Sequence, residues 1–136
     1  MEDSKLLLGV IQFIHFLIDS FNMTYIFIFS AVYDIYFVIW IFLQTVHWGL
    51  LKNECIVSYI EKKMIDPNYE LGENPKWIPH YDIYYNKYTI TLKSILIIGT
   101  LLFIFIRSKS INTRIICGMA IVLWLYLVYF YKKSQL

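Results

Sequence analysis

The sequence predicts an all-α protein that crosses a membrane four times. Of its 136 residues, 59% are hydrophobic and 16% are charged, whereas soluble domains average about 45–50% apolar and about 25% charged residues. The apolar residues form long runs that leave no polar face toward water, which suits a lipid environment. We therefore expect one membrane domain over residues 1–136, with four transmembrane helices in two hairpins. Three spans are the alternative.

The first apolar run, Leu6 to Ile18, contains the polar residues Gln12 and His15. As a helix it would be roughly 20 Å long, which is short of a hydrocarbon core of about 30 Å. It is therefore a marginal span, and a helix lying in the membrane interface is the alternative. After it, Asp19-Ser20-Phe21-Asn22 supplies residues that favour helix N-caps, which predicts a tight turn between two helices.

The second run, Met23 to Leu51, would be about 43 Å long as a helix, so it can cross the bilayer and project beyond it. Asp34 would then lie roughly 16 Å deep, where a charged side chain costs at least ~2.5–3.5 kcal/mol. Asp34 is expected either to serve a proton or cation relay or to join helices as a hydrogen-bonded carboxyl. His15 is the other mid-span ionisable group, and its alternative is a neutral imidazole bonded within its own helix or to Asp19.

Residues 52–87 form the one large extramembrane loop, because their composition is polar and prolines interrupt them. Within this loop, Ile56 to Met64 could form a short helix. The spans Tyr88 to Ile106 and Ile115 to Tyr131 follow, joined by a short basic turn at 107–114.

The distribution of basic residues predicts the sidedness of the chain. Four spans place the amino terminus, the long loop and the carboxyl terminus on one side. That side carries nine basic residues (Lys5, Lys52, Lys62, Lys63, Lys76, Lys87, Lys93, Lys132 and Lys133), and the other carries three (Arg107, Lys109 and Arg114). The positive-inside rule therefore predicts that the termini and the loop are cytoplasmic.

The expected partners follow from the same composition. The net charge of +2 is too small to indicate nucleic acid binding. The lipid bilayer is the predicted partner, together with other membrane proteins or a second copy of the chain through helix packing. Two cysteines are too few for a disulfide scaffold, so we expect Cys55 and Cys117 to be free thiols near opposite membrane faces.

Reactive side chains gather where the second apolar run ends, and a histidine follows near the end of the loop: His47, Glu54, Cys55, Glu61 and His80. If the helix continues to Cys55, His47 and Glu54 lie on the same face, two turns apart. Imidazole, thiolate and carboxylate groups bind zinc and serve acid–base or nucleophilic chemistry. The spacing contains no paired CxxC and no HExxH, so it specifies no cofactor or metal. Packing and helix capping at the membrane surface are the alternative.

The segment Cys55-Ile56-Val57-Ser58-Tyr59-Ile60-Glu61, followed by Tyr69, Gly72 and His80-Tyr81, resembles a family of small multi-pass bacterial membrane proteins. Members carry Cys-Pro-Leu-Thr-x-Leu-Glu after their second span, then a Tyr and a Gly, then His-Tyr before the third. Ile56 stands here for the proline of the family and Ser58 for its threonine. The resemblance implies no activity, because the role of that family is unassigned. It implies that Cys55, Ser58, Glu61 and His80 belong to one packed unit, with the loop folded onto the helix end.

Three functions remain open from the sequence. The absence of a specific catalytic motif favours a non-enzymatic membrane component or assembly factor that works through helix packing. The second hypothesis is a small membrane enzyme or metal-binding protein that uses the residues from His47 to His80 named above. The third is a proton or ion conductor centred on Asp34.

Overall fold

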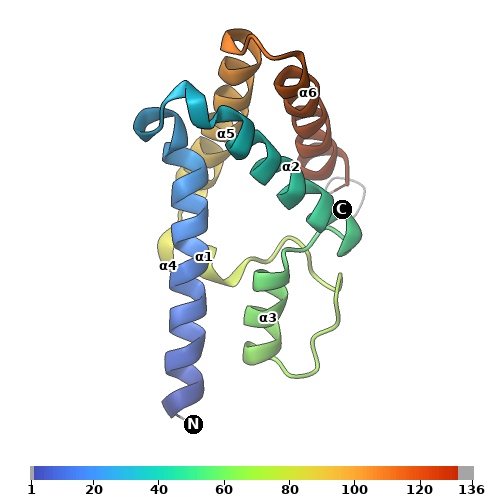
Figure 1. The fold of residues 1–136 in the computed structure, drawn as a ribbon. Coiled ribbons are helices and arrows are strands. Elements are labelled where there is room, and N and C mark those ends of the chain that lie inside the picture. Colours follow the sequence, from blue (N-terminus) through green and yellow to red (C-terminus); the bar gives the residue numbers. More distant parts are fainter. Residues whose placement is uncertain (1, 132–136) are drawn as a thin grey trace.

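Four long helices and two short ones make up the computed structural model, which describes residues 2–131 (Figure 1). The long helices are α1 (Glu2–Ile28), α2 (Asp34–Leu50, preceded by the 3-10 turn Ala31–Tyr33), α5 (Lys87–Arg107) and α6 (Ile111–Leu125, followed by the π-helical turn Tyr126–Tyr131). The short helices are α3 (Ile56–Ile65) and α4 (Pro79–Tyr84). Between residues 2 and 131 no strand occurs, so the predicted all-α class is confirmed.

Four helical segments are long and apolar enough to cross a membrane: Glu2–Ile28, Ala31–Leu50, Lys87–Arg107 and Ile111–Val128. The prediction of four spans is therefore confirmed, and the three-span alternative is not supported. Large apolar side chains such as Leu6, Phe27, Leu43 and Ile106 are exposed on the outer faces of these helices. In lipid such an outer face is favourable, because the acyl chains are as apolar as the side chains.

The turn predicted at residues 19–22 is wrong, because α1 continues without interruption to Ile28. The polar residues there are held inside the bundle and cap no helix: Asp19 bonds to His80 and Lys93, and Asn22 bonds to Gln44 and Trp40. The chain instead reverses at Ser30, whose backbone is extended (φ −77°, ψ 162°). The single run predicted from Met23 to Leu51 is thus two helices.

Asp34 consequently lies at the first turn of α2 and not deep within a span. A carboxylate is favourable at a helix amino terminus because the helix dipole is positive there. Arg107, the last residue of α5, donates from Nε to Asp34 Oδ2 at 2.7 Å, and a second guanidinium nitrogen contacts Oδ1. Tyr25 also donates to Asp34 Oδ1 at 3.0 Å.

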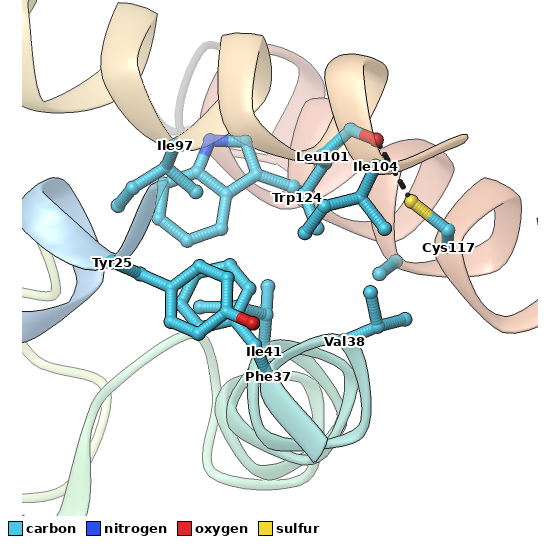
Figure 2. Close-up of a cluster of buried hydrophobic side chains, with 10 residues drawn as sticks. Tyr25, Phe37, Val38, Ile41, Ile97, Leu101, Ile104, Cys117 and Trp124 are labelled. Carbon is cyan, nitrogen blue, oxygen red and sulfur yellow. Dashed lines mark hydrogen bonds between the residues drawn. The ribbon is translucent and has the colours of Figure 1, made fainter. Parts of the chain in front are cut away.

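The apolar core forms where α2 packs along α6 and α6 packs along α5 (Figure 2). Val38 and Ile41 of α2 meet Ile97, Leu101 and Ile104 of α5 and Cys117, Ala120 and Trp124 of α6, all of them buried. The Cys117 thiol donates to the Leu101 carbonyl at 3.0 Å. Both cysteines are free thiols, as expected.

Helix α1 differs from the other spans in length and in its buried face. Its 27 residues extend about 40 Å, so its first half passes beyond the α2–α5–α6 bundle and lies beside α3 and α4 (Figure 1). The buried residues of α1 are mostly polar and recur every three or four positions: Gln12, His15, Asp19, Asn22 and Tyr25. This spacing places them on one face of the helix.

Helix α2 ends at Leu50, because Lys52 and Asn53 adopt left-handed backbone conformations with φ of 52° and 63°. The expectation that the helix persists to Cys55 is therefore wrong. The chain reverses and begins α3 at Ile56, which confirms the short helix predicted from Ile56 to Met64. We call the end of the molecule that carries residues 51–86 the loop side, and the end that carries Ser30 and residues 108–110 the turn side (Figure 1).

Candidate functional site

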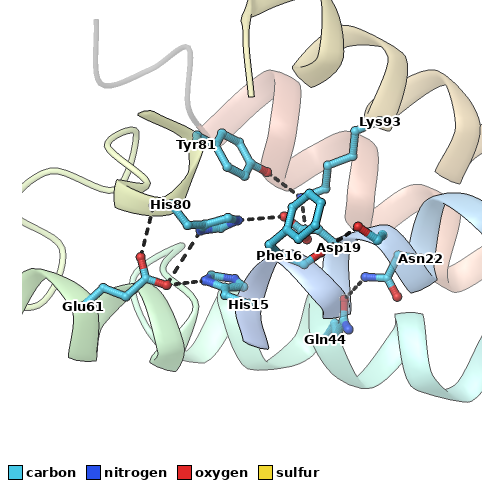
Figure 3. Close-up of polar contacts among 10 residues, drawn as sticks. His15, Phe16, Asp19, Asn22, Gln44, Glu61, His80, Tyr81 and Lys93 are labelled. Carbon is cyan, nitrogen blue, oxygen red and sulfur yellow. Dashed lines mark hydrogen bonds and ion pairs between the residues drawn. The ribbon is translucent and has the colours of Figure 1, made fainter. Parts of the chain in front are cut away.

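Buried polar side chains from four helices meet on the loop side of the bundle (Figure 3). Helix α1 contributes His15 and Asp19, α3 contributes Glu61, α4 contributes His80 and Tyr81, and α5 contributes Lys93. We call these six residues the polar cluster. Helix α1 is far in the sequence from α3, α4 and α5, so only the folded chain brings the cluster together.

Two histidines and one carboxylate form its centre. Glu61 Oε1 lies 2.7 Å from His15 Nδ1 and 3.7 Å from His80 Nδ1. The other carboxylate oxygen, Oε2, accepts from the backbone N–H of His80 at 3.2 Å. The centroids of the two imidazole rings lie 3.9 Å apart, with the ring planes tilted by 38°. His15, Glu61 and His80 are all buried, and one ligand atom from each lies within 4.8 Å of the others.

Asp19 connects this centre to α5. Its Oδ2 lies 3.0 Å from His80 Nε2, and its Oδ1 lies 2.7 Å from Lys93 Nζ. The Lys93 ammonium also donates to the Tyr81 hydroxyl. A carboxylate on Nε2 makes that nitrogen the protonated one, which leaves Nδ1 of His80 as an acceptor. That acceptor is fully buried and has no hydrogen-bond partner in the part of the chain that the structure describes.

Cys55 approaches the cluster from the amino end of α3, where it is the N-cap residue. Its thiol is half-buried, and Cys55 and His15 line the same cavity. Burial raises the pKa of Cys55, but the nearby His15 side chain and the backbone amides of Val57 and Ser58 outweigh it, so the pKa lies below its ordinary value. Glu61 behaves similarly: burial raises its pKa, but the hydrogen bond to His15 contributes to lowering it below the usual range.

A cavity of about 120 Å³ lies between the polar cluster and the ends of α2, α5 and α6. Its lining includes the polar residues His15, Asp19, Cys55, Ser58, His80 and Lys93. It also includes the apolar residues Trp48, Ile90, Trp124 and Val128. This volume holds a few water molecules or a small polar group. The cavity therefore offers both reactive groups and apolar contact surface.

A second buried ion pair borders the same cavity. Lys62 Nζ donates to Glu54 Oε1 at 2.6 Å and to the Asn74 carbonyl at 2.7 Å. Tyr69 donates to Glu54 Oε1 and accepts from Lys62. Burial and the bond to Glu54 raise the pKa of Tyr69 above its ordinary value. This group fixes the loop between α3 and α4, because its partners lie on residues 69–74.

The residues predicted from the sequence fall in three places. Cys55 and His80 line the cavity and Glu61 bonds to both histidines, so three of the candidates meet at the polar cluster. Glu54 also lines the cavity but is engaged by Lys62. His47 does not line it: its Nε2 accepts from the backbone N–H of Ile56 at 2.9 Å and so caps the start of α3.

The two predicted intramembrane groups, His15 and Asp34, lie on opposite sides of the bundle. His15 belongs to the polar cluster, although its main partner is Glu61 on α3 and not Asp19 on its own helix. Asp34 is on the turn side, paired with Arg107. Asp19 and Lys93 belong to the cluster but were not expected there, because the sequence presents them as a helix cap and as a loop-side cation. The sequence did carry a signal for Asp19, because His15 and Asp19 are four residues apart and therefore share one helix face.

The packed unit implied by the family resemblance can be compared with these positions. Cys55, Ser58 and His80 line one cavity, and Glu61 contacts His80. Gly72 adopts φ 86°, and a Cβ there would lie 2.6 Å from Lys52 Cδ, so this turn requires glycine. Comparison of the chain with known protein families, curated proteins and solved structures finds no match. Membership of that family therefore stays a prediction.

Proposed function

We propose that the protein is a membrane enzyme that uses Cys55 as the nucleophile of an acyl-transfer or hydrolysis reaction. One arrangement carries the proposal: Cys55 and His15 line the same cavity, and Glu61 is bonded to His15, so the three can serve as nucleophile, base and orienting carboxylate. Glu61 holds Nδ1 of His15 at 2.7 Å, which leaves Nε2 for the thiol. A nucleophile beside a base that a third group orients is the general signature of covalent catalysis.

The reaction proceeds in two steps. His15 Nε2 accepts the proton of the Cys55 thiol, and the sulfur attacks the carbonyl carbon of an acyl donor. The new C–S bond forms while the bond to the leaving group breaks, and His15 returns its proton to the leaving group. Water or an acceptor hydroxyl then attacks the thioester with His15 as the base, which releases the acyl group and restores Cys55. Glu61 keeps the imidazole in the tautomer that both steps need.

The cavity supports an amphipathic acyl donor. Its lining includes Cys55 and His15 as well as Trp48 and Trp124, whose ring centroids lie 5.2 Å apart. Tryptophan is enriched where a membrane meets water, because its ring is apolar and its N–H is polar. The carbonyl group of a lipid-borne acyl donor would enter this cavity toward the thiol, while its chain stays outside in the lipid.

The proposal is tested by trapping the acyl-enzyme in the full-length protein in detergent. After incubation with a medium-chain p-nitrophenyl ester, mass spectrometry should find the acyl group on Cys55 and not on Cys117. Cys117 is the matched internal control, because it is a buried thiol already bonded to Leu101. His15→Gln should slow p-nitrophenol release by about 10² or more, the usual contribution of a general base, and Cys117→Ala should leave it unchanged.

Two results would count against an enzyme. Equal labelling of Cys55 and Cys117, or a Cys55→Ser variant that releases p-nitrophenol as fast as the wild type, removes the catalytic role of the thiol. The polar cluster would then hold the loop onto α1, and the non-enzymatic membrane component or assembly factor would be the better account.

We also propose that the loop side faces the cytoplasm. The support is the excess of basic residues there, nine against three, of which Lys132 and Lys133 lie outside the described residues. An epitope tag at the amino terminus should be protected from protease in sealed vesicles whose outer surface is the extracellular one. Digestion of the tag in such vesicles would reverse the assignment.

A further inference from the structure

We propose that His15, Glu61 and His80 form a binding site for a divalent transition metal ion such as Zn²⁺, and that an ion bound there withdraws His15 and Glu61 from Cys55. The binding site stands on the geometry of the polar cluster alone. Its regulatory consequence rests on the proposed function of Cys55. The site lies at the boundary of α1, α3 and α4, whose residues Figure 3 shows converging.

The first support is the unpartnered nitrogen of His80. Its Nδ1 is fully buried, lacks a hydrogen-bond partner among residues 2–131, and lies 3.7 Å from Glu61 Oε1. A buried polar atom without a partner costs about 1–3 kcal/mol. A metal ion between His80 Nδ1 and Glu61 would satisfy this nitrogen, and no protein group in the described chain does so.

The second support is the spacing of the donor atoms. Bonds of about 2.0–2.1 Å at tetrahedral angles place neighbouring ligand atoms about 3.3 Å apart. Here Glu61 Oε1 lies 2.7 Å from His15 Nδ1 and 3.7 Å from His80 Nδ1, and the three donor atoms all lie within 4.8 Å of one another. Small shifts of these side chains would bring the three donor atoms toward one ion.

The third support is the charge balance around the cavity. Asp19 is paired with Lys93, and Glu54 is paired with Lys62. Glu61, in contrast, contacts no lysine or arginine among the described residues; its partners are the two histidines. A buried carboxylate requires a compensating positive charge. A divalent ion supplies that charge while both imidazoles stay neutral, which is the form that binds metal.

The fourth support is the position of Asp19. Histidines that bind metals almost always donate their other ring N–H to a carboxylate or carbonyl, which fixes the tautomer. Asp19 Oδ2 takes this place for His80, 3.0 Å from Nε2. Asp19 is in turn held by Lys93. His80 is thus oriented with its free lone pair toward Glu61.

The ligand set selects a class of ion. Two imidazoles and one carboxylate suit zinc, iron and related transition metals, whereas magnesium and calcium prefer oxygen ligands. Three protein ligands also leave a position open for water, as in catalytic rather than structural sites. A metal on Nδ1 of His15 requires the ring proton to sit on Nε2. That nitrogen can then no longer accept the proton of Cys55.

The test measures metal binding in the full-length protein, with Cys55→Ser as the background so that thiol chemistry is absent. Chelator-treated protein is loaded with Zn²⁺, freed of excess ion and analysed by mass spectrometry. One ion per chain is expected, and it should be lost in His80→Ala. His47→Ala is the matched control, because His47 is a histidine of the loop side that lies outside the cluster. Asp19→Asn should weaken binding by about 10–100-fold.

Two outcomes overturn the site: no bound Zn²⁺ in the Cys55→Ser protein, or binding that survives both His15→Ala and His80→Ala. The first needs no variant of the cluster, so it holds even if His80→Ala fails to fold. Regulation is then tested with Cys55 present. Zn²⁺ should slow alkylation of Cys55 by iodoacetamide in the wild type, and the ratio of rates with and without Zn²⁺ should approach one in His80→Ala.

The two proposals can fail separately. Zinc bound by a protein that forms no acyl-enzyme leaves the metal site standing and removes the enzyme. An acyl-enzyme on Cys55 in a protein that binds no zinc supports the enzyme and removes the metal site. Zinc that binds but leaves the alkylation rate of Cys55 unchanged removes only the regulatory link.

Discussion

The two ends of the membrane bundle each bury a carboxylate, but they neutralise it in different ways. On the turn side, Asp34 receives two guanidinium contacts from Arg107 and a hydrogen bond from Tyr25. On the loop side, Glu61 has only histidine partners, and one of these keeps a buried nitrogen unsatisfied. A carboxylate paired with a permanent cation has its charge balanced without any ligand, whereas the charge of Glu61 is balanced only by a proton or an added cation.

This difference separates structural polar groups from functional ones. A carboxylate paired with lysine or arginine is expected to matter for stability, and a carboxylate whose only side-chain partners are histidines is expected to matter for binding or chemistry. The pair of Glu54 and Lys62 provides the sharpest test, because it borders the same cavity as the polar cluster but resembles Asp34 and Arg107 in its pairing.

Lys62→Met should have the largest effect on stability. Lys62 and Glu54 are both fully buried, so removing the ammonium leaves an uncompensated carboxylate, which costs about 3–5 kcal/mol. Unfolding in detergent, followed by tryptophan fluorescence, should show this loss. At a temperature where the variant is still folded, one Zn²⁺ per chain should remain bound.

The double variant Glu54→Gln with Lys62→Met is the control for this prediction. It removes both charges and should recover most of the lost stability, because the uncompensated charge is gone. A Lys62→Met protein as stable as the wild type would break the comparison, since a buried carboxylate with its cation removed would then cost nothing.

Asp34→Asn should have a smaller effect on stability and none on the loop side. Arg107 is a quarter exposed, so solvent screens the pair, and we expect a loss of about 1–3 kcal/mol, below that for a fully buried pair. Zinc binding and the labelling of Cys55 should be unchanged. The same protein in liposomes tests conduction: proton flux in the wild type that disappears in Asp34→Asn would show that the turn side carries function after all.

Sequence reasoning succeeded where neighbouring residues determine the structure, and it failed where the interacting residues are far apart in the sequence. The third span was predicted almost to its ends, because Lys87 and Arg107 flank a mainly apolar run. The first turn was misplaced because Asp19 and Asn22 have the side chains of helix caps. Their actual partners, such as His80 and Gln44, lie on helices that the sequence alone cannot bring near.

The candidate site was predicted in part for the same reason. Cys55, Glu61 and His80 stand out in a polar loop and are indeed neighbours in the folded chain. Lys93 looks like an interfacial cation until α5 places it against Asp19. His47 was grouped with them on the assumption that α2 continues, but the left-handed residues Lys52 and Asn53 reverse the chain before Cys55.

His47→Ala is the smallest predicted effect, and it tests whether position in the fold or residue type decides a role. The imidazole accepts one hydrogen bond, from the Ile56 N–H at 2.9 Å, at a site close to the surface. Its loss should cost about 0.5–1.5 kcal/mol, the net worth of one hydrogen bond. Thermal unfolding measures this cost. The zinc content and the alkylation rate of Cys55 should both equal those of the wild type.

His15→Ala provides the contrast, because it removes the same type of side chain from the polar cluster. That variant should lose the bound ion and slow the labelling of Cys55, since His15 is bonded to Glu61 and lines the same cavity as Cys55. If His47→Ala and His15→Ala had equal effects on zinc content, the ion would not depend on the geometry of the cluster. The unsatisfied nitrogen of His80 would then need another explanation, such as a bound water molecule between His80 and Glu61.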